Sequence, residues 1–237
     1  MTNPLSSLQF LGPVLELNDA RPVLNEIGLS YARYNLSLNA GECALIQCRD
    51  LQQASLFTDI CSGLAPIGEG RVRCLGLEWK DLEDRRASAL RGRIGRIFQG
   101  NEWIELYPMQ MNILWQRLYH SKTSLNELIK EAVKLSIRFG LPGLPTQLPG
   151  KLSSLDLRRA EYVRAFMGNP SLMLLEEPVT IEPSELYDAF LGELTAVRER
   201  GCAVIWISSD ASVWKDYEQS DMQKFRLSDS GLITMRG

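Results

Sequence analysis

Short apolar runs that alternate with amphipathic helical stretches constrain the fold of this 237-residue chain most strongly. The runs cover residues 43–47, 93–98, 172–175 and 202–207. Each is shorter than an ordinary helix, and turn residues such as Gly41, Pro170 and Gly201 precede three of them, which favours buried strands. Because helical stretches separate the runs, we expect an α/β domain with a mainly parallel sheet and crossover helices.

The helices between these strands carry recognisable end signals. Ser124 and Glu127 form a capping box before an amphipathic stretch, and Ser153 can cap a second helix. A third helix is expected from about Pro183 to Gly201. Near the C-terminus, residues 225–227 and 232–234 predict an antiparallel hairpin.

Composition narrows the functional classes. Hydrophobic residues make up 45% of the chain and charged residues 23%, as in ordinary globular proteins, and the net charge of -3 gives no reason to expect a nucleic-acid partner. No apolar stretch approaches the roughly 18 residues that span a bilayer, and the first residues do not resemble a secretion signal. The five cysteines lack a C-x-x-C pair and there is one histidine, so we expect reduced thiols and no metal site.

Several motifs occur in an order typical of one family. They are the lead-in 34–42, Gly63-Leu64 with Pro66, the strand ending at Gln99, the helix opening at Leu152-Ser153, and the segment 170–178 (PSLMLLEEP). Over nearly the whole chain, this order and spacing resemble the ATP-binding domain of ABC transporters. The resemblance implies a P-loop NTPase-like fold in a single domain, 1–237, with a mainly parallel core sheet, antiparallel strands near both termini and a helical subdomain. Residues 1–98 and 156–237 would form the core and β subdomain, and residues 99–155 the helical subdomain.

The segment at the phosphate-loop position departs from the family pattern G-x-x-x-x-G-K-[ST]. Glycines in that pattern let backbone N–H groups surround phosphate, and the lysine neutralises its charge. No Gly-Lys-Ser or Gly-Lys-Thr occurs in the chain. The aligned residues are Cys48, Arg49, Asp50, Leu51, Gln52, Gln53, Ala54 and Ser55, of which only Ser55 matches. We therefore expect this loop not to hold a triphosphate and the chain to have no cofactor, with ATP and Mg²⁺ relevant only if an active alternative holds.

The other positions that the resemblance assigns to chemistry are partly retained. Gln99 matches the Q-loop glutamine, Glu177 the general base, and Ser153 the serine of the signature sequence. Glu176 replaces the aspartate of the magnesium shell, and Ser209 stands where a histidine is expected. Glu177 and Gln99 are thus the candidate catalytic residues, with Glu177 expected to be vestigial, and Ser55, Ser153 and Glu176 are weak candidates for nucleotide contacts. Tyr31 and Tyr34 lie upstream, where an aromatic residue for base stacking would be expected.

An apolar and aromatic segment, 101–115, is the candidate docking surface. In the resembling family this region receives a membrane permease. A core role accounts for about half of these side chains and docking for the rest. The candidate partner-binding residues are Trp103, Leu106, Tyr107, Met109 and Met111.

Three functions stay open at this point. The leading hypothesis is a pseudo-ATPase subunit, peripheral on the cytoplasmic face of a membrane, which docks on a permease and pairs with a second ATPase-like subunit. The second is one half of an asymmetric dimer that hydrolyses ATP. The third is a soluble regulator that kept the fold.

Overall fold

The computed structural model describes residues 12–23, 32–100, 102–180 and 183–235. Within them a six-stranded sheet has the order β10-β9-β3-β8-β7-β6. Its central strands are parallel: β3 (Cys43–Gln47), β6 (Ile94–Ile97), β7 (Leu172–Glu176) and β8 (Ala203–Ser208). The hairpin of β9 (Gln223–Ser228) and β10 (Gly231–Thr234) adds to one edge, with β9 parallel to β3. The predicted sheet and hairpin are confirmed.

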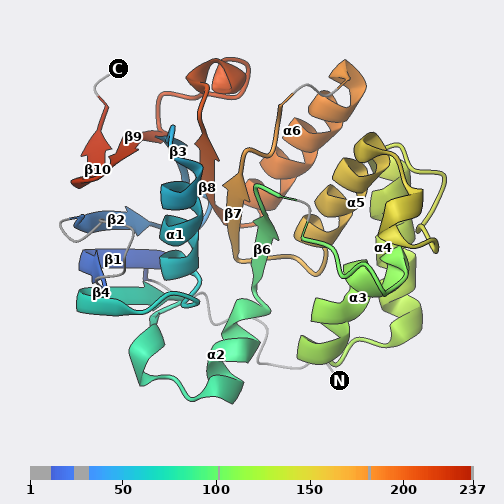
Figure 1. The fold of residues 1–237 in the computed structure, drawn as a ribbon, viewed down its shortest axis with the longest axis horizontal. Helices are drawn as coiled ribbons and strands as arrows, with labels where there is room; N and C mark the ends of the chain where they lie inside the picture. Colours follow the sequence, from blue (N-terminus) through green and yellow to red (C-terminus); the bar gives the residue numbers. More distant parts are fainter. Residues whose placement is uncertain (1–11, 24–31, 101, 181–182, 236–237) are drawn as a thin grey trace.

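A second, antiparallel sheet lies beside the first (Figure 1). Its order is β2-β1-β4-β5, and its strands are β1 (Leu15–Pro22), β2 (Tyr34–Leu38), β4 (Ile67–Cys74) and β5 (Leu77–Glu78). The short 3₁₀ helix η1 (Trp79–Asp81) and helix α2 (Asp84–Arg91) then lead to β6. The pattern of apolar runs alone does not indicate β1, β2 and β4, whose exposed faces carry polar residues. The N-terminal antiparallel strands agree instead with the fold that the family resemblance implies.

The six-stranded sheet is covered on both faces, which explains its nearly continuous apolar strands. On one face, Ala44, Ile46 and Leu174 pack with α1 (Leu51–Cys61) and the antiparallel sheet. On the other, Leu45 and Trp206 join a core with the remaining helices. These are α3 (Met109–His120), α4 (Leu125–Arg138), α5 (Ser154–Phe166) and α6 (Ser184–Glu199), with 3₁₀ helices η2 (Pro149–Lys151) and η3 (Ala211–Trp214).

Helix starts agree closely with the sequence signals. Ser124 accepts a hydrogen bond from the Glu127 N–H, and the Glu127 carboxylate accepts one from the Ser124 N–H, so the capping box is formed. Ser153 caps α5 by accepting from the Asp156 N–H at 3.1 Å. Helices α3, α4 and α5 pack against one another (Figure 1). The proposed subdomain boundaries at residues 99 and 155 stay a prediction.

All five cysteines are buried as free thiols, as expected. Burial raises the pKa of the Cys43 and Cys202 thiols to about 12, which keeps them protonated at neutral pH. In the part of the chain that the structure describes, none of the helices has both the length and the apolar character needed to cross a bilayer.

Candidate functional site

The segment at the phosphate-loop position is largely helical. Helix α1 begins at Leu51, so Leu51 to Ser55 form its first turn and a half instead of an open loop. Asp50 is the N-cap: its carboxylate accepts from the N–H groups of Gln52 at 2.9 Å and Gln53 at 3.2 Å. A capping carboxylate satisfies the amides that a phosphate would otherwise meet.

The side chains of this turn are partly withdrawn into the protein. Gln53 and Ala54 are buried, Cys48 is buried, and Leu51 is exposed. The Cys48 thiol lies 3.0 Å from the carbonyl oxygen of Asp50. Ala54 occupies the position of the expected lysine, and its methyl group cannot bind a phosphate oxygen. The sequence predicted a loop here, and the helix forms because an aspartate cap replaces the glycines.

Glu176, at the end of β7, lies in a dense hydrogen-bond network. Its side chain is 2% exposed. One carboxylate oxygen accepts from the Ser55 hydroxyl at 2.6 Å, and the other accepts from the Thr58 hydroxyl at 2.8 Å. The structure thus brings together Ser55 and Glu176, which the resemblance places in one site.

Arg96, on β6, completes this network and was not singled out from the sequence. Its Nε and Nη2 donate to the same Glu176 oxygen at 3.1 and 2.9 Å, and its Nη1 donates to Asp59 at 2.6 Å. Nη2 also donates to the Thr58 hydroxyl, and the guanidinium lies over the Phe98 ring at 4.4 Å from the ring centre. The signal that could have found it is a single cation inside an otherwise apolar strand.

Glu177 is held by the strand next to it. Its Oε2 accepts from the Ser208 hydroxyl at 2.9 Å, and its Oε1 accepts from the Ser209 N–H. The backbone at Glu177 has a positive φ of 44°, which is uncommon for a residue with a side chain and fixes where the carboxylate lies. Both carboxylate oxygens are thus engaged by the segment where the family would place its histidine.

Gln99 and Ser153 lie in different surroundings. Gln99 is exposed and lines an open cavity of about 280 Å³ together with Ser55 and Glu176. Ser153 lies outside this cavity, at the start of α5, where its hydroxyl donates to the Asp156 carboxylate at 2.9 Å. The structure therefore groups Gln99, Ser55 and Glu176, and places Ser153 elsewhere.

A buried ion pair lies behind Phe98. Glu161 is fully buried, accepts from the Phe98 N–H at 3.2 Å and pairs with Arg158 at 2.8 Å. Burial raises the pKa of Glu161 and lowers the pKa of Arg164, and each charge opposes the shift of the other. The Arg164 guanidinium lies 4.2 Å from the Trp103 ring centre, so Trp103 is part of the interior.

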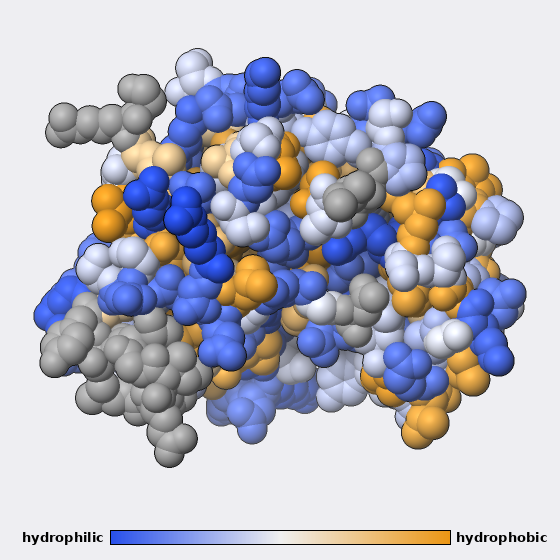
Figure 2. Space-filling model, turned by 45° about the horizontal axis from the view of Figure 1, so that its top comes forward, coloured by the Kyte–Doolittle hydropathy of each residue, from blue (hydrophilic) through white to orange (hydrophobic). Residues whose placement is uncertain are grey.

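The predicted docking residues divide between core and surface. Trp103 and Met109 are buried, so neither offers its side chain to a partner. Leu106 is 87% exposed and Tyr107 43%, and Tyr107 stacks on the exposed Trp115. Figure 2 shows hydrophobic side chains in several places on the side of the molecule that carries α3 to α5. The exposed apolar residues from this segment and α3 are Ile104, Leu106, Tyr107, Trp115, Leu118 and Tyr119, hereafter the α3 surface.

The tyrosine expected to stack on a nucleotide base is unavailable for that role. Tyr34 is fully buried and packs edge-on against Phe57, with ring centres 5.1 Å apart. Burial raises the pKa of Tyr34 to about 12. Tyr31 lies outside the described residues. The interpretation of Tyr34 as a base-stacking residue is therefore wrong, because this side chain belongs to the core between β2 and α1.

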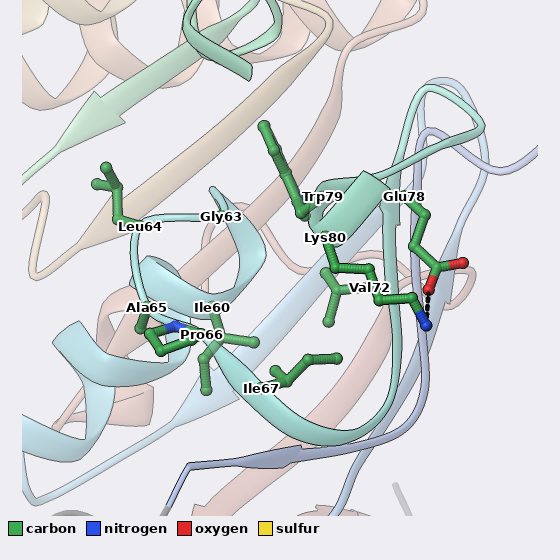
Figure 3. A pocket seen from close by; sticks show the side chains of 10 residues that line it. All are labelled: Ile60, Gly63, Leu64, Ala65, Pro66, Ile67, Val72, Glu78, Trp79 and Lys80. Atoms are coloured by element: carbon green, nitrogen blue, oxygen red, sulfur yellow. Dashed lines mark ion pairs between the residues drawn. The ribbon is translucent and has the colours of Figure 1, made fainter. Parts of the chain in front are cut away.

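A separate pocket of about 250 Å³ lies between the end of α1, β4 and η1 (Figure 3). Its walls are mainly apolar, and the Trp79 indole is fixed by donating to the Cys61 carbonyl oxygen at 3.1 Å. Glu78 and Lys80 form an ion pair at 2.7 Å at its edge. The pocket contains none of the residues that the family resemblance assigns to chemistry.

Taken as a possible nucleotide site, the described residues do not fit the cradle that the family motif provides. The first amides of α1 already bind Asp50, no lysine stands at position 54, and Glu176 is already paired with Arg96. A site for Mg²⁺ and triphosphate needs free N–H donors and uncompensated acidic oxygens.

Comparisons with known proteins identify the family. No family model matches the chain. The phosphonates import ATP-binding protein PhnC of Bordetella parapertussis is 30% identical over 185 residues, covering 74% of this chain and 70% of that protein. The lipoprotein-releasing system ATP-binding protein LolD 1 of Rhodospirillum rubrum is 25% identical, covering 85% and 88%. The macrolide export ATP-binding/permease protein MacB of Shigella sonnei is 27% identical, covering 85% of this chain and 32% of that protein.

Solved structures agree with this assignment at the level of the fold. A dimeric ATP-binding cassette in a post-hydrolysis state, bound to ADP and phosphate, superposes with a TM-score of 0.78. It is 21% identical, and the match covers 94% of this chain and 99% of that one. The P-loop NTPase-like fold is thereby confirmed. The chain belongs to the family of ABC transporter ATP-binding proteins.

The names and ligands of related proteins contradict the expectation of no cofactor. The sequence led us to expect no cofactor, but the relatives are named ATP-binding proteins, and a protein of the same fold holds ADP and phosphate. ATP is the ligand for which the family is named, so the expectation of no cofactor is wrong. That expectation was based on the altered sequence at the phosphate-loop position alone.

Proposed function

We propose that this chain is the ATP-binding-cassette subunit of a transport complex, and that its own α1 site does not catalyse ATP hydrolysis. In this role it docks on a membrane permease at the cytoplasmic face and pairs with a second ATPase-like subunit. The chain then contributes to assembly and regulation, while hydrolysis takes place in the partner's site.

The observation that carries this proposal is the helical turn from Leu51 to Ser55 with its Asp50 cap. Hydrolysis needs donors that stabilise charge on the transferred phosphoryl group, supplied in this fold by loop amides and a lysine. Here Asp50 occupies the amides of Gln52 and Gln53, and Ala54 supplies no positive charge. A negative carboxylate thus stands where negative phosphate charge has to be stabilised.

The surroundings of Glu177 support the same conclusion. A general base acts only when its carboxylate can accept a proton from the attacking water. In this chain both oxygens of Glu177 accept hydrogen bonds, from Ser208 and from the Ser209 backbone. The serine at 209 offers no imidazole to a γ-phosphate. These hydrogen bonds hold the Glu177 side chain against the end of β8 and give it a structural role in this chain.

The α3 surface supports docking on a partner. Its six exposed apolar side chains come from one continuous segment and the helix that follows it. Tyr107 of the segment stacks on Trp115 of the helix, and exposed apolar side chains that gather on a surface mark interaction sites in folded proteins. Among the relatives, MacB is named an ATP-binding/permease protein, so an ATP-binding domain is joined to a permease in that protein.

The experiment is an ATPase assay on the transport complex purified from membranes with this chain tagged. We expect Glu177→Gln in this chain to leave the ATPase rate of the complex unchanged. The same substitution at the matching glutamate of the companion ATPase subunit is the control and abolishes the rate. A large loss of activity with Glu177→Gln in this chain would overturn the proposal.

A further inference from the structure

One arginine ties three elements of the fold together at the carboxyl end of the parallel sheet. Arg96 comes from β6, and it contacts Glu176 at the end of β7 and Asp59 on α1. Its side chain is only 10% exposed. Phe98 lies against one face of the guanidinium, and Thr58 accepts from Nη2 at 2.8 Å. Every one of these contacts is made within a single subunit.

The charge balance at Glu176 depends on this arginine. A carboxylate that is 2% exposed is costly to hold as an anion unless a cation and hydrogen-bond donors compensate it. Ser55 and Thr58 supply neutral donors at 2.6 and 2.8 Å. Among the described residues, Arg96 is the cation within ion-pair distance of Glu176.

The ion pair between Arg96 and Glu176 lies where the family resemblance places a magnesium ion. The acidic residue at the end of this strand belongs to a magnesium shell in that pattern, where the metal supplies the positive charge. In this chain the guanidinium reaches the same carboxylate and shares it with two hydroxyl donors. An octahedral shell at about 2.1 Å cannot form on an oxygen that already accepts three hydrogen bonds at 2.8 to 3.1 Å.

We propose that Arg96 is a built-in counter-ion of Glu176, which fixes α1, β6 and β7 to one another without a divalent cation. It provides, as part of the fold, the local positive charge that a metal would otherwise bring. The planar fork of arginine suits this position, since it can serve Glu176 and Asp59 at the same time. The contacts of Arg96 can be tested without nucleotide, by thermal unfolding and by Mn²⁺ binding, so the outcome does not depend on an ATPase assay.

The test is a double-mutant cycle measured by thermal unfolding without nucleotide. Arg96→Met keeps an unbranched apolar stem, removes the charge and leaves Glu176 uncompensated, so we expect the Tm to fall by about 10 °C. In a Glu176→Gln background the same substitution should cost much less, because no buried anion is left unpaired. Equal losses in both backgrounds would overturn the proposal.

Two further variants keep the cycle interpretable. Arg93→Met is the matched control, because Arg93 lies just before β6, is exposed, and donates a hydrogen bond to the Ser171 hydroxyl at 2.9 Å. We expect its Tm to stay close to that of the wild type. If Arg96→Met does not fold, Arg96→Lys retains the charge and should fold with a smaller loss. A Lys variant as damaging as the Met variant would contradict a role based on charge.

Mn²⁺ binding followed by electron paramagnetic resonance gives an independent measurement. We expect Arg96→Met to expose the acidic oxygens of Glu176 and Asp59 and to bind Mn²⁺ more tightly than the wild type. The gain should disappear in the Arg96→Met, Glu176→Gln double variant. Mn²⁺ binding by the wild-type chain that is lost in Glu176→Gln would show that Arg96 does not occupy this carboxylate, and would overturn the proposal.

Discussion

The region around the start of α1 and the α3 surface differ in how far their side chains are paired within the chain. At α1, the charged groups of Asp50, Arg96 and Glu176 are engaged by partners in the same chain. On the α3 surface, large apolar side chains such as Leu106 and Tyr119 stay exposed, at 87% and 75%. The charged groups of the first region are paired within the chain, whereas the α3 surface leaves large apolar side chains in contact with solvent.

This difference indicates which parts of the family pattern the chain has kept. A site that binds a ligand leaves donors and charges unsatisfied in the free protein, and the α1 region has few of these. A docking surface leaves apolar area unsatisfied, and the α3 surface has much of it. We infer that assembly, more than chemistry at α1, accounts for the sequence of this chain.

The largest effect on stability outside the Arg96 cycle should come from Thr58→Val. Thr58 is fully buried, and its hydroxyl contacts both Glu176 and Arg96 at 2.8 Å. Replacing the hydroxyl with a methyl group of similar size removes one hydrogen bond from each of these charged partners. The loss should lower the free energy of unfolding by about 2 to 3 kcal/mol. Chemical denaturation measures the change. Thr123→Val, on an exposed loop, is the control, and equal effects at the two positions would contradict a closed α1 network.

Asp50→Ala should have the next largest effect. Loss of the N-cap should lower the free energy of unfolding by about 1 kcal/mol. The substitution also frees the N–H groups of Gln52 and Gln53 and removes a negative charge, so inorganic phosphate should bind more tightly. Denaturation and a phosphate titration by calorimetry measure the two changes. A stability loss without any gain in phosphate affinity would show that Asp50 does not block the amides.

Leu106→Ser should change stability by less than about 0.5 kcal/mol, because exposed positions without special contacts tolerate substitution. Its effect should appear instead in assembly. We expect the tagged variant to be recovered from the membrane fraction in a smaller proportion than the wild type. Leu148→Ser is the matched control, since Leu148 is 45% exposed and lies outside the α3 surface. Equal loss of membrane recovery in both variants would contradict a specific docking role for the α3 surface.

The smallest effect concerns pH. His120, the only histidine, lies at the end of α3, and burial together with Arg117 and Arg91 lowers its pKa. The unfolded chain therefore takes up a proton at higher pH than the folded one, so stability should decline as the pH falls below about 6.5. His120→Gln should flatten this decline between about pH 6.5 and the lowered pKa. If the pH dependence of stability is unchanged in the variant, the decline comes from carboxylates and not from His120.

Much of the fold could be predicted because its signals are local. The capping box at Ser124, the cap at Ser153 and the apolar strand β7 each follow from residues adjacent in the chain. The contacts of Arg96 could not be predicted, because its partners lie 37 and 80 residues away in sequence. The helical start of α1 was missed for a different reason. The family alignment favoured a loop there, although Asp50 followed by helix-forming residues is itself a capping signal.

Tertiary contacts also decide which residues of segment 101–115 lie in the core and which on the surface. Composition alone could not assign Trp103 to the core and Tyr107 to the surface, since both are aromatic residues of one short segment. The decision comes from Arg164 on α5, whose guanidinium packs on Trp103 and donates to the Glu102 carbonyl oxygen at 2.8 Å. A tertiary contact of this kind produces no periodic pattern of apolar residues, so the sequence does not indicate it.

A steady-state ATPase assay on the purified chain distinguishes an α1 site that does not catalyse ATP hydrolysis from one that does. The wild type is compared with Glu177→Gln at saturating Mg²⁺ and ATP. We predict that both preparations release phosphate at the same background rate. A wild-type rate well above background that disappears in Glu177→Gln would show that Glu177 acts as a general base and that the α1 site is catalytic.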